Sequence, residues 1–433
     1  LGWLLVYPGI MQFFTTILAL ASIALAAPSH HPQQDDSLKR AAWPNGPLVT
    51  QGRYIRDSTG KNLTYAGTNW PGHNDAMFPE GLQYQSIEFI VQKIKSIGIN
   101  AVRLTFAIQM VDEIYSNGGK DITIQQALVQ ALGQANGAKI LNQILAKNPR
   151  FTASTTRLQV FDAVAQELSK QQIFIHLDNH ISKGTWCCGA DDGNTWFGDK
   201  YFSVANWTRG LGYMADHGKS WPGFVSVGLR NELREPSNNQ AAKNTYNWQT
   251  WYQYMKQGAQ AVNNANKDVL IFLSGLNYDT YINPVFEGTA LTPGTGKFSF
   301  NDFPGYANKL VLEIHNYETG INSCSSLQNN LYSKGFKAMS SSAVNVFPVM
   351  LTEFGFAMDA NTYKNTYASC LSTYLPSQKA GWTIWVLAGS YYIRSGKQDY
   401  DEDWGMLNHD WSNWRQPAYI NGPFSSMVKG TLN

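Results

Sequence analysis

The chain has 433 residues, enough to bury a large hydrophobic core and to form one α/β barrel of ordinary size. Only 15% of the residues are charged and the formal net charge is +2. This balance argues against a nucleic acid or an anionic membrane as the partner.

The first forty residues have the features of targeting and processing segments. An apolar stretch after Met11 ends in Ala24-Leu25-Ala26, a small-x-small cleavage pattern, and Lys39-Arg40 offers a dibasic processing site. The apolar stretch is short for a bilayer span and is followed by polar sequence, which disfavours a membrane anchor. We expect translated upstream sequence over 1–10, a signal peptide over 11–27, a propeptide over 28–40, and a secreted domain over 41–433.

In a secreted protein, the sequence predicts two kinds of covalent modification, N-glycosylation and disulfide bonds. Asn62 and Asn206 each begin an Asn-x-Thr glycosylation sequon, and Asn62 is the less certain because it precedes a predicted strand. Four cysteines allow three disulfide pairings in an oxidising compartment. We favour Cys324 with Cys370, together with either a vicinal Cys187–Cys188 bridge or two buried thiols.

Eight short apolar runs follow the leader, and each has the length and composition of a buried strand. In chain order they are Tyr65–Asn69, Ala101–Phe106, Ile173–Asp178, Val225–Asn231, Val269–Ser274, Leu310–His315, Val346–Glu353 and Trp382–Leu387.

Segments with helical periodicity separate these runs. Their apolar faces are Ile87, Ile90, Val91, Ile94 and Ile97; Leu158, Phe161, Ala165 and Leu168; and Trp248, Tyr252, Met255, Ala259 and Val262. Alternating strands and helices imply parallel pairing, and eight such units predict a single (β/α)8 TIM barrel. A doubly wound open sheet is less favoured, because no Gly-rich phosphate-binding turn opens any of the helices.

Three long connections interrupt the regular alternation, over residues 107–157, 181–221 and 388–415. All three follow strands, so they should lie at the C-terminal face, where barrel proteins build their sites. Polar or aromatic residues also gather where the runs end. They are Arg103, Asp178, Asn179, His180, Asn231, Glu232, His315, Asn316, Tyr317, Glu353 and Trp385.

Two glutamates among these residues indicate a specific chemistry. Glu232 and Glu353 each follow a buried run, and cleavage of a glycosidic bond needs one carboxyl group to protonate the leaving oxygen and another to attack or activate water. Three other carboxylates have different expected roles. Glu313 should form a structural ion pair in the barrel, Glu235 should be solvated or anchor a loop, and Asp178 could support His180.

The ordered set Arg103, His180, Asn231-Glu232, His315-x-Tyr317, Glu353 and Trp385 resembles the active site of family 5 glycoside hydrolases, a cellulase-like family of retaining barrel enzymes. The resemblance covers about the whole mature chain. Finer features resemble the subfamily 11 branch shared by fungi and plants, namely Leu229–Arg234, the Trp186-Cys187-Cys188 loop and Gly389-Ser390-Tyr391-Tyr392. Leu233 follows Glu232 where proline is common, which weakens substrate inference from other branches.

The resemblance implies that Glu232 is the acid/base and that Glu353 is the nucleophile, kept ionised by Arg103 and Tyr317. Retention requires carboxyl groups roughly 5–5.5 Å apart, whereas inversion requires about 6.5–9.5 Å, and we predict the shorter separation. The resemblance further implies that Asn231 binds the sugar 2-hydroxyl. It also implies that His180 and His315 bind hydroxyls or orient the acid/base, and that Trp385 provides a stacking floor.

Tryptophans in Gly/Asn/Asp-rich loops are candidates for sugar-binding surfaces, because sugar rings present apolar faces that stack on indole. The candidates are Trp70, Trp186, Trp196 and Trp404, with Trp411 and Trp414 as further members of the group. The loop 186–196 also contains Cys187, Cys188, Asp191, Asp192 and Asn194, but its spacing matches neither a zinc nor a twelve-residue calcium pattern. We therefore expect neither a metal nor another cofactor.

The sequence thus predicts a secreted, monomeric, retaining glycoside hydrolase acting on an oligo- or polysaccharide. The simplest activity is that of an endo-β-1,4-glucanase. An exo- or oligosaccharide-specific β-glycosidase, a hydrolase of mannan or another β-glycan, and a carbohydrate-binding protein without activity are the alternatives. The presence of both Glu232 and Glu353 argues against the last of these.

Overall fold

The structure is a computed structural model that describes residues 43–433. The predicted upstream sequence (1–10), signal peptide (11–27) and propeptide (28–40) lie outside the described residues. Within residues 43–433, no helix is both long enough and apolar enough to cross a bilayer.

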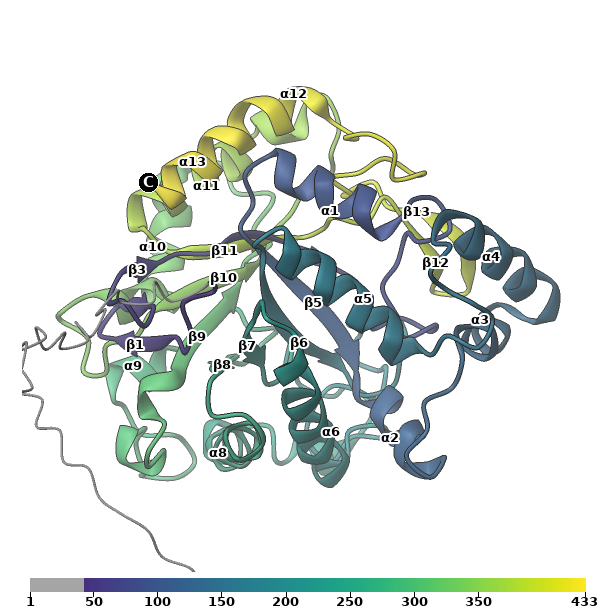
Figure 1. Ribbon diagram of the computed structural model, residues 1–433. Coiled ribbons are helices and arrows are strands. Elements are labelled where there is room, and N and C mark those ends of the chain that lie inside the picture. The colour runs from purple at the N-terminus through teal and green to yellow at the C-terminus, as the bar shows by residue number, and fades with distance from the viewer. Residues whose placement is uncertain (1–42) are drawn as a thin grey trace, which may run out of the picture. The chain divides into compact units, whose positions relative to one another are not determined.

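Eight parallel strands close a barrel in which strands consecutive in the chain are neighbours, in the order β10-β11-β4-β5-β6-β7-β8-β9 (Figure 1). This confirms the predicted (β/α)8 barrel and excludes the open sheet. The strands are β4 (Ala66–Trp70), β5 (Ala101–Ala107), β6 (Phe174–Ile181), β7 (Phe224–Gly228), β8 (Leu270–Leu273), β9 (Leu310–His315), β10 (Val349–Glu353) and β11 (Gly381–Ile384).

Helices surround the barrel strands in Figure 1. They are α1 (Ile87–Ser96), α2 (Ile108–Ser116), α3 (Ile124–Leu132), α4 (Gln134–Lys147), α5 (Arg157–Lys170), α6 (Val204–His217), α7 (Gln240–Lys243), α8 (Trp248–Ala265), α9 (Asn283–Glu287), α10 (Cys324–Lys334), α11 (Thr366–Gln378), α12 (Pro417–Tyr419) and α13 (Ser425–Leu432).

The predicted apolar faces of three helices pack inward as expected. Every predicted face residue of α1, α5 and α8 is buried except Ile97, the residue that ends α1 and is half-buried. Side-chain caps start these helices, from Ser86 on α1 and from a Thr156–Gln159 capping box on α5. Local sequence and tertiary burial therefore agree on where the helices lie.

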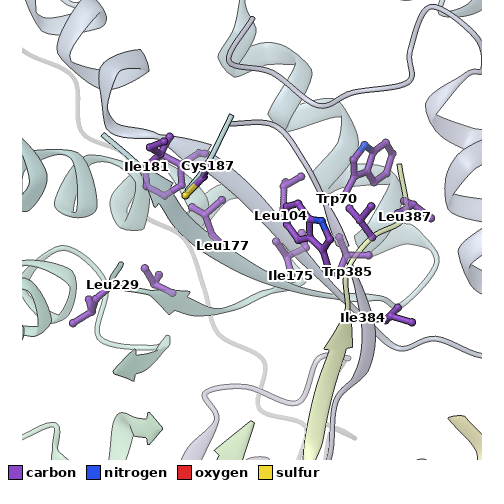
Figure 2. Close-up of a cluster of buried hydrophobic side chains, with 14 of the residues drawn as sticks. Trp70, Leu104, Ile175, Leu177, Ile181, Cys187, Leu229, Ile384, Trp385 and Leu387 are labelled. Atoms are coloured by element: carbon purple, nitrogen blue, oxygen red, sulfur yellow. The ribbon is translucent and has the colours of Figure 1, made fainter. Parts of the chain in front are cut away.

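The barrel interior has an apolar lower part and a polar upper part, and residues two apart on a strand share the interior face. One buried cluster closes the lower end and contains Leu48, Ile55, Tyr65, Ala101, Phe174, Val225, Leu270, Phe272, Val311 and Met350. Further along the same strands, Arg103, Asp178 and Glu313 are completely buried. The second, larger cluster fills the layer between strands and helices, and Figure 2 shows a part of it around Trp70, Leu104 and Leu177.

Small sheets lie beyond both ends of the barrel. The antiparallel sheet of β1 (Val49–Gln51), β2 (Tyr54–Arg56) and β3 (Asn62–Leu63) supplies Ile55 to the lower apolar cluster. The hairpin of β12 (Ser390–Arg394) and β13 (Lys397–Asp401) belongs to the predicted insertion after the last barrel strand. In Figure 1 the β1–β3 sheet and this hairpin lie on opposite sides of the barrel strands.

Candidate active site

The polar residues at the strand ends converge on one cleft of about 400 Å³. Sequence-predicted residues line it together with residues of the long connections. The lining residues are His180, Trp186, Cys187, Cys188, Glu232, Tyr317, Glu353, Trp385, Arg394, Glu402, Asp403 and Trp404.

Glu353 is the last residue of β10, and two donors hold its carboxylate. Arg103 Nη1 lies 2.6 Å from Oε1, and the Tyr317 hydroxyl donates to Oε2 at 2.9 Å. Burial raises the pKa of Glu353 above its usual value, while His315, Arg103 and the Tyr317 hydrogen bond oppose that rise. These contacts are the ones that favour an ionised carboxylate.

Arg103 connects this carboxylate to the rest of the site. Its guanidinium lies 3.0 Å from Asp178 Oδ1 and donates to Asn231 Oδ1 at 2.8 Å and to Asn69 Oδ1 at 2.9 Å. Arg103 is completely buried, so these partners are what makes its charge tolerable in the barrel. The arginine therefore orients both Glu353 and Asn231.

Glu232 lies four residues beyond the end of β7, so the predicted strand Val225–Asn231 is too long. The backbone of Glu232 itself, one residue past the end of the predicted strand, has a φ of 45°, in the left-handed region. Its side chain is 13% exposed, and Oε1 lies 3.1 Å from His315 Nδ1. Burial raises the pKa of Glu232 to about 7, against the opposing charges of Arg234 and Arg103.

The two glutamates meet at His315. Besides its contact with Glu232, His315 Nδ1 lies 3.7 Å from Glu353 Oε2, and one carboxylate oxygen of each glutamate lies within 4.8 Å of the other. Burial lowers the pKa of His315 to about 4, so its ring is neutral at pH 7. Two carboxyl groups in different surroundings thus face the same space, Glu232 with a pKa raised to about 7 and Glu353 with two hydrogen-bond donors.

Asn231, His180 and Trp385 lie beside this pair. The Asn231 amide nitrogen is 3.5 Å from His180 Nε2, and His180 Nδ1 is 2.7 Å from Asp178 Oδ2. The predicted support of His180 by Asp178 is therefore confirmed as a contact. The His180 ring stacks on Trp385 with centroids 5.4 Å apart and an interplanar angle of 13°.

Comparison with known proteins identifies the family. The profile of the family described as Cellulase (glycosyl hydrolase family 5) matches residues 57–390, more than half of the chain. The chain belongs to glycosyl hydrolase family 5.

Similar proteins agree with this assignment. A glycosyl hydrolase 5 family protein from Chamaecyparis obtusa is 33% identical over 433 residues, which cover 96% of this chain and 69% of that protein. An endoglucanase from Paenibacillus polymyxa is 23% identical over 388 residues, 87% of this chain and 86% of that protein.

Solved structures share the fold at lower identity. The catalytic domain of the major endoglucanase from Xanthomonas campestris pv. campestris has a TM-score of 0.61 at 20% identity, covering 88% of this chain and 99% of that one. An endocellulase from Pyrococcus horikoshii in complex with cellotetraose has a TM-score of 0.65 at 17% identity, covering 90% and 99%.

Two of the four tryptophans that were predicted to line sugar subsites of this glycosyl hydrolase lie in its core instead. Trp186 and Trp404 line the cleft, whereas Trp70 and Trp196 are completely buried. Trp70 packs against Trp411 with ring centroids 6.3 Å apart and donates its indole N–H to the Glu80 carbonyl. Both rings are fully buried in the hydrophobic core, so they are core residues and not sugar-binding surfaces.

Trp196 is held in the same way, between Phe197 and Tyr246, whose ring centroids are both 4.8 Å away. Trp411 is also completely buried, and Trp414 is half-buried with the Lys93 ammonium 5.8 Å from its ring. Neither Trp411 nor Trp414 lines the cleft.

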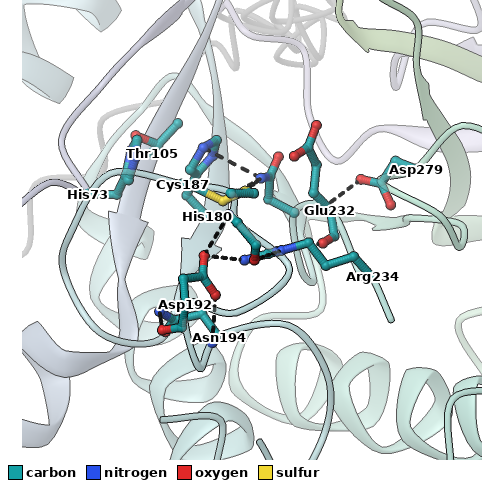
Figure 3. The surroundings of a disulfide bond; sticks show 12 residues. His73, Thr105, His180, Cys187, Asp192, Asn194, Glu232, Arg234 and Asp279 are labelled. Atoms are coloured by element: carbon teal, nitrogen blue, oxygen red, sulfur yellow. Dashed lines mark hydrogen bonds and ion pairs between the residues drawn. A yellow bond between two sulfur atoms is a disulfide. The ribbon is translucent and has the colours of Figure 1, made fainter. Parts of the chain in front are cut away.

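The disulfide favoured from the sequence is present, and of the two alternatives for Cys187 and Cys188 the structure has the vicinal bridge. Cys324 at the start of α10 pairs with Cys370 of α11, and Cys187 pairs with Cys188. The vicinal pair forms part of the cleft wall, and the Asn231 amide nitrogen lies 3.5 Å from Cys188 Sγ (Figure 3).

The loop around the vicinal pair is held by an ion pair. Arg234 Nη2 lies 2.6 Å from Asp192 Oδ2, and the same carboxylate accepts the backbone N–H groups of Gly189 and Asn194 (Figure 3). Asp192, for which the sequence predicted no role, therefore helps to shape the cleft wall around the vicinal disulfide.

Glu313 does not form the ion pair that we predicted. It is completely buried and makes no ion pair within residues 43–433. Burial raises its pKa to about 7, which reduces its charge at neutral pH and lowers the need for an ionic partner. Glu235, by contrast, is exposed and lies 3.5 Å from Lys243 Nζ, as expected for a solvated side chain.

Two residues next to the site, after the first and fifth barrel strands β4 and β8, were not predicted from the sequence. His73 lies 3.9 Å from His180 between ring centroids, and its Nδ1 is 2.7 Å from Thr105 Oγ1. Asp279 accepts the backbone N–H of Glu232 at 3.0 Å. Both residues come within ten positions of the end of a predicted run, and that position was the available signal.

Arg394 and Glu402 were also missed, because they come from the insertion after β11. Arg394 Nη1 lies 2.6 Å from Glu402 Oε2, and the guanidinium lies 3.5 Å from the centre of the Trp186 ring. A cation over an indole face is an attractive contact. It joins the β12–β13 insertion to the loop after β6 within the lining of the cleft.

Proposed function

We propose that this glycosyl hydrolase is a retaining endo-β-1,4-glucanase that uses Glu232 as acid/base and Glu353 as nucleophile. The observation that carries the proposal is the pair of carboxylate oxygens within 4.8 Å of each other. That separation is on the side of the roughly 5–5.5 Å typical of retaining enzymes, because inverting enzymes need about 6.5–9.5 Å to admit a water.

In the first step a Glu353 oxygen bonds to the anomeric carbon while the glycosidic C–O bond breaks. The proton of Glu232 moves to the leaving oxygen. In the second step Glu232, now a carboxylate, removes a proton from water, and the oxygen of that water replaces Glu353 at the anomeric carbon. The pKa of Glu232, raised by burial to about 7, supports its assignment as the group that starts protonated.

Neighbouring residues would stabilise the transition state. The Asn231 amide is oriented through its oxygen by Arg103, and its nitrogen is directed to weak acceptors, a disulfide sulfur and His180. It is thus available to donate to the sugar 2-hydroxyl, an interaction that strengthens as charge develops. Trp385, held by its stacking on His180, would support the face of the same sugar.

The names of similar proteins support a β-glucan as substrate, since relatives are described as an endoglucanase and as an endocellulase bound to cellotetraose. One observation favours a second candidate, an exo- or oligosaccharide-specific β-glycosidase. The Arg394–Trp186 contact joins two long connections within the cleft lining and could limit the length of the bound chain.

Three further proposals concern branch, location and modification. The Trp186-Cys187-Cys188 loop supports the fungal and plant subfamily 11 branch, and the pattern around Met11 supports secretion. The structure favours Asn62 over Asn206 as a glycan acceptor. Asn62 is exposed, whereas the half-buried Asn206 donates its amide to Asp112 at 3.0 Å.

Product analysis tests the proposed activity. Purified protein is incubated with cellulose derivatives, mixed β-glucan, mannan and cello-oligosaccharides, and products are followed by chromatography and by the anomeric proton signals. Mixed oligomers of retained configuration from β-1,4-glucan are expected. Release of mono- or disaccharide alone would favour the second candidate, and inverted products would refute the assignment of Glu353 as nucleophile.

A further inference from the structure

Asp279 lies in the loop after β8 and is completely buried although it carries a carboxyl group. The loop is docked on the segment that contains Glu232 by two hydrogen bonds. Tyr278 N donates to the Leu233 carbonyl at 3.0 Å, and Glu232 N donates to Asp279 Oδ2 at 3.0 Å (Figure 3). A buried carboxyl group needs such partners, because its transfer from water is otherwise costly.

The hydrogen bond to Glu232 falls at a strained point of the backbone. Glu232 has a φ of 45°, a conformation that is unfavourable for residues other than glycine and persists only where the surroundings hold it. The acceptor on Asp279 is thus a contact that keeps the Glu232 backbone turned, and with it the direction of the side chain toward His315 and Glu353.

Asp279 also contacts His315, whose ring lies beside the Glu232 carboxyl group. The His315 backbone N–H donates to the Asp279 carbonyl at 2.9 Å, and Asp279 Oδ2 lies 3.7 Å from His315 Nε2. This distance is too long for a hydrogen bond, but the partial negative charge of the oxygen facing Nε2 favours the tautomer with the proton on that nitrogen. Nδ1, 3.1 Å from Glu232 Oε1, then becomes the acceptor for a protonated Glu232.

We propose that Asp279 is a positioning residue that holds Glu232 in its proton-donating orientation, through the Glu232 backbone and through the tautomer of His315. This inference rests on the proposed function of Glu232 as the acid/base. Asp279 does not line the cleft, so it acts through these two residues and not on the sugar.

The proposed role depends on Oδ2 as an acceptor and not on the net charge of Asp279. Burial, with the nearby Glu313, raises the pKa of Asp279, but a proton on Oδ1 leaves Oδ2 able to accept the Glu232 backbone N–H and to face His315 Nε2 at 3.7 Å. Asparagine keeps such an oxygen, whereas alanine does not. The two substitutions therefore separate this role from a role of charge.

The experiment compares Asp279→Ala and Asp279→Asn on two substrates. Protonation of the leaving group is needed for a cello-oligosaccharide but not for a dinitrophenyl cellobioside, whose phenolate leaves unaided. For Asp279→Ala we expect kcat/KM to fall by about 10- to 100-fold on the oligosaccharide, a part of the 10²–10⁴-fold that a general acid contributes. On the dinitrophenyl substrate kcat/KM should stay within about threefold, and Asp279→Asn should restore most of the loss.

Glu232→Gln and Asn277→Gly provide the references. Asn277 is exposed in the same loop and has a φ of 50°, so glycine keeps the loop conformation and should leave both rates unchanged. Equal losses on the two substrates for Asp279→Ala, or no loss on either, would overturn the inference. If Glu232→Gln itself showed no difference between the substrates, the proposed function of Glu232 would fail instead.

Discussion

The elevated pKa of Glu232 makes a prediction about stability as well as catalysis. The pKa is about 7 in the folded protein against a usual value of 4.5, because burial disfavours the carboxylate. At about 1.4 kcal/mol per pKa unit, ionising this side chain in the folded state costs about 3 kcal/mol more than in the unfolded chain. Glu232→Gln removes that cost, because the amide cannot ionise.

The sign follows from proton uptake. Below pH 4.5 Glu232 is protonated in both states, so the substitution should leave the free energy of unfolding unchanged. As the pH rises from 4.5 through 7, the unfolded chain loses its proton first and the wild-type protein is progressively destabilised. At pH 8 Glu232→Gln should therefore be more stable than the wild type by about 3 kcal/mol.

Denaturant unfolding at pH 4 and at pH 8 measures this difference. Glu235→Gln is the matched control, since it changes an exposed carboxylate three residues further along the chain. The same titration should appear in catalysis, where kcat/KM of the wild type falls as the pH rises through about 7 because the proton donor is lost. A gain in stability equal at both pH values, or a kcat/KM that stays constant to pH 9, would refute the reasoning.

Three further predictions concern the nucleophile, the cleft wall and the disulfide. Glu353→Ala should abolish hydrolysis, and azide should restore turnover of an aryl β-cellobioside to give the α-azide, seen by NMR; a β-azide would contradict the assignment. Trp186→Ala should raise KM without changing the unfolding midpoint, whereas Trp196→Ala should cost about 3–5 kcal/mol of stability. The reverse pattern would place the binding surface elsewhere. Replacing Cys324 and Cys370 by alanine opens a link across 46 residues and should cost about 4 kcal/mol in denaturant unfolding, with an unchanged midpoint as the contrary result.

The barrel and the two glutamates could be predicted because their signals are local. A run such as Leu310–His315 is apolar and short, and its predicted bounds agree with β9. The order of strands and helices then determines the topology, since parallel neighbours need crossover helices. Polar residues at the ends of those runs were brought together by the barrel itself, as Arg103 and Glu353 were at 2.6 Å.

The incorrect predictions concern side chains whose surroundings depend on contacts between segments distant in the sequence. Trp70 and Trp196 stand in polar sequence, yet each packs against aromatic rings from other segments that the local pattern does not reveal. Glu313 was expected to need an ionic partner, but burial raises its pKa and reduces its charge. Neither outcome is encoded in the few residues around the side chain.

The sequence by itself therefore determined the architecture, the family and the two carboxyl groups available for chemistry. The tertiary structure alone decided how these groups differ. It placed their oxygens within 4.8 Å, surrounded one with Arg103 and Tyr317, and buried the other beside a neutral His315. The physical reason is that a pKa and a separation depend on the dielectric and the charges nearby in space, and the fold brings those together from distant parts of the chain.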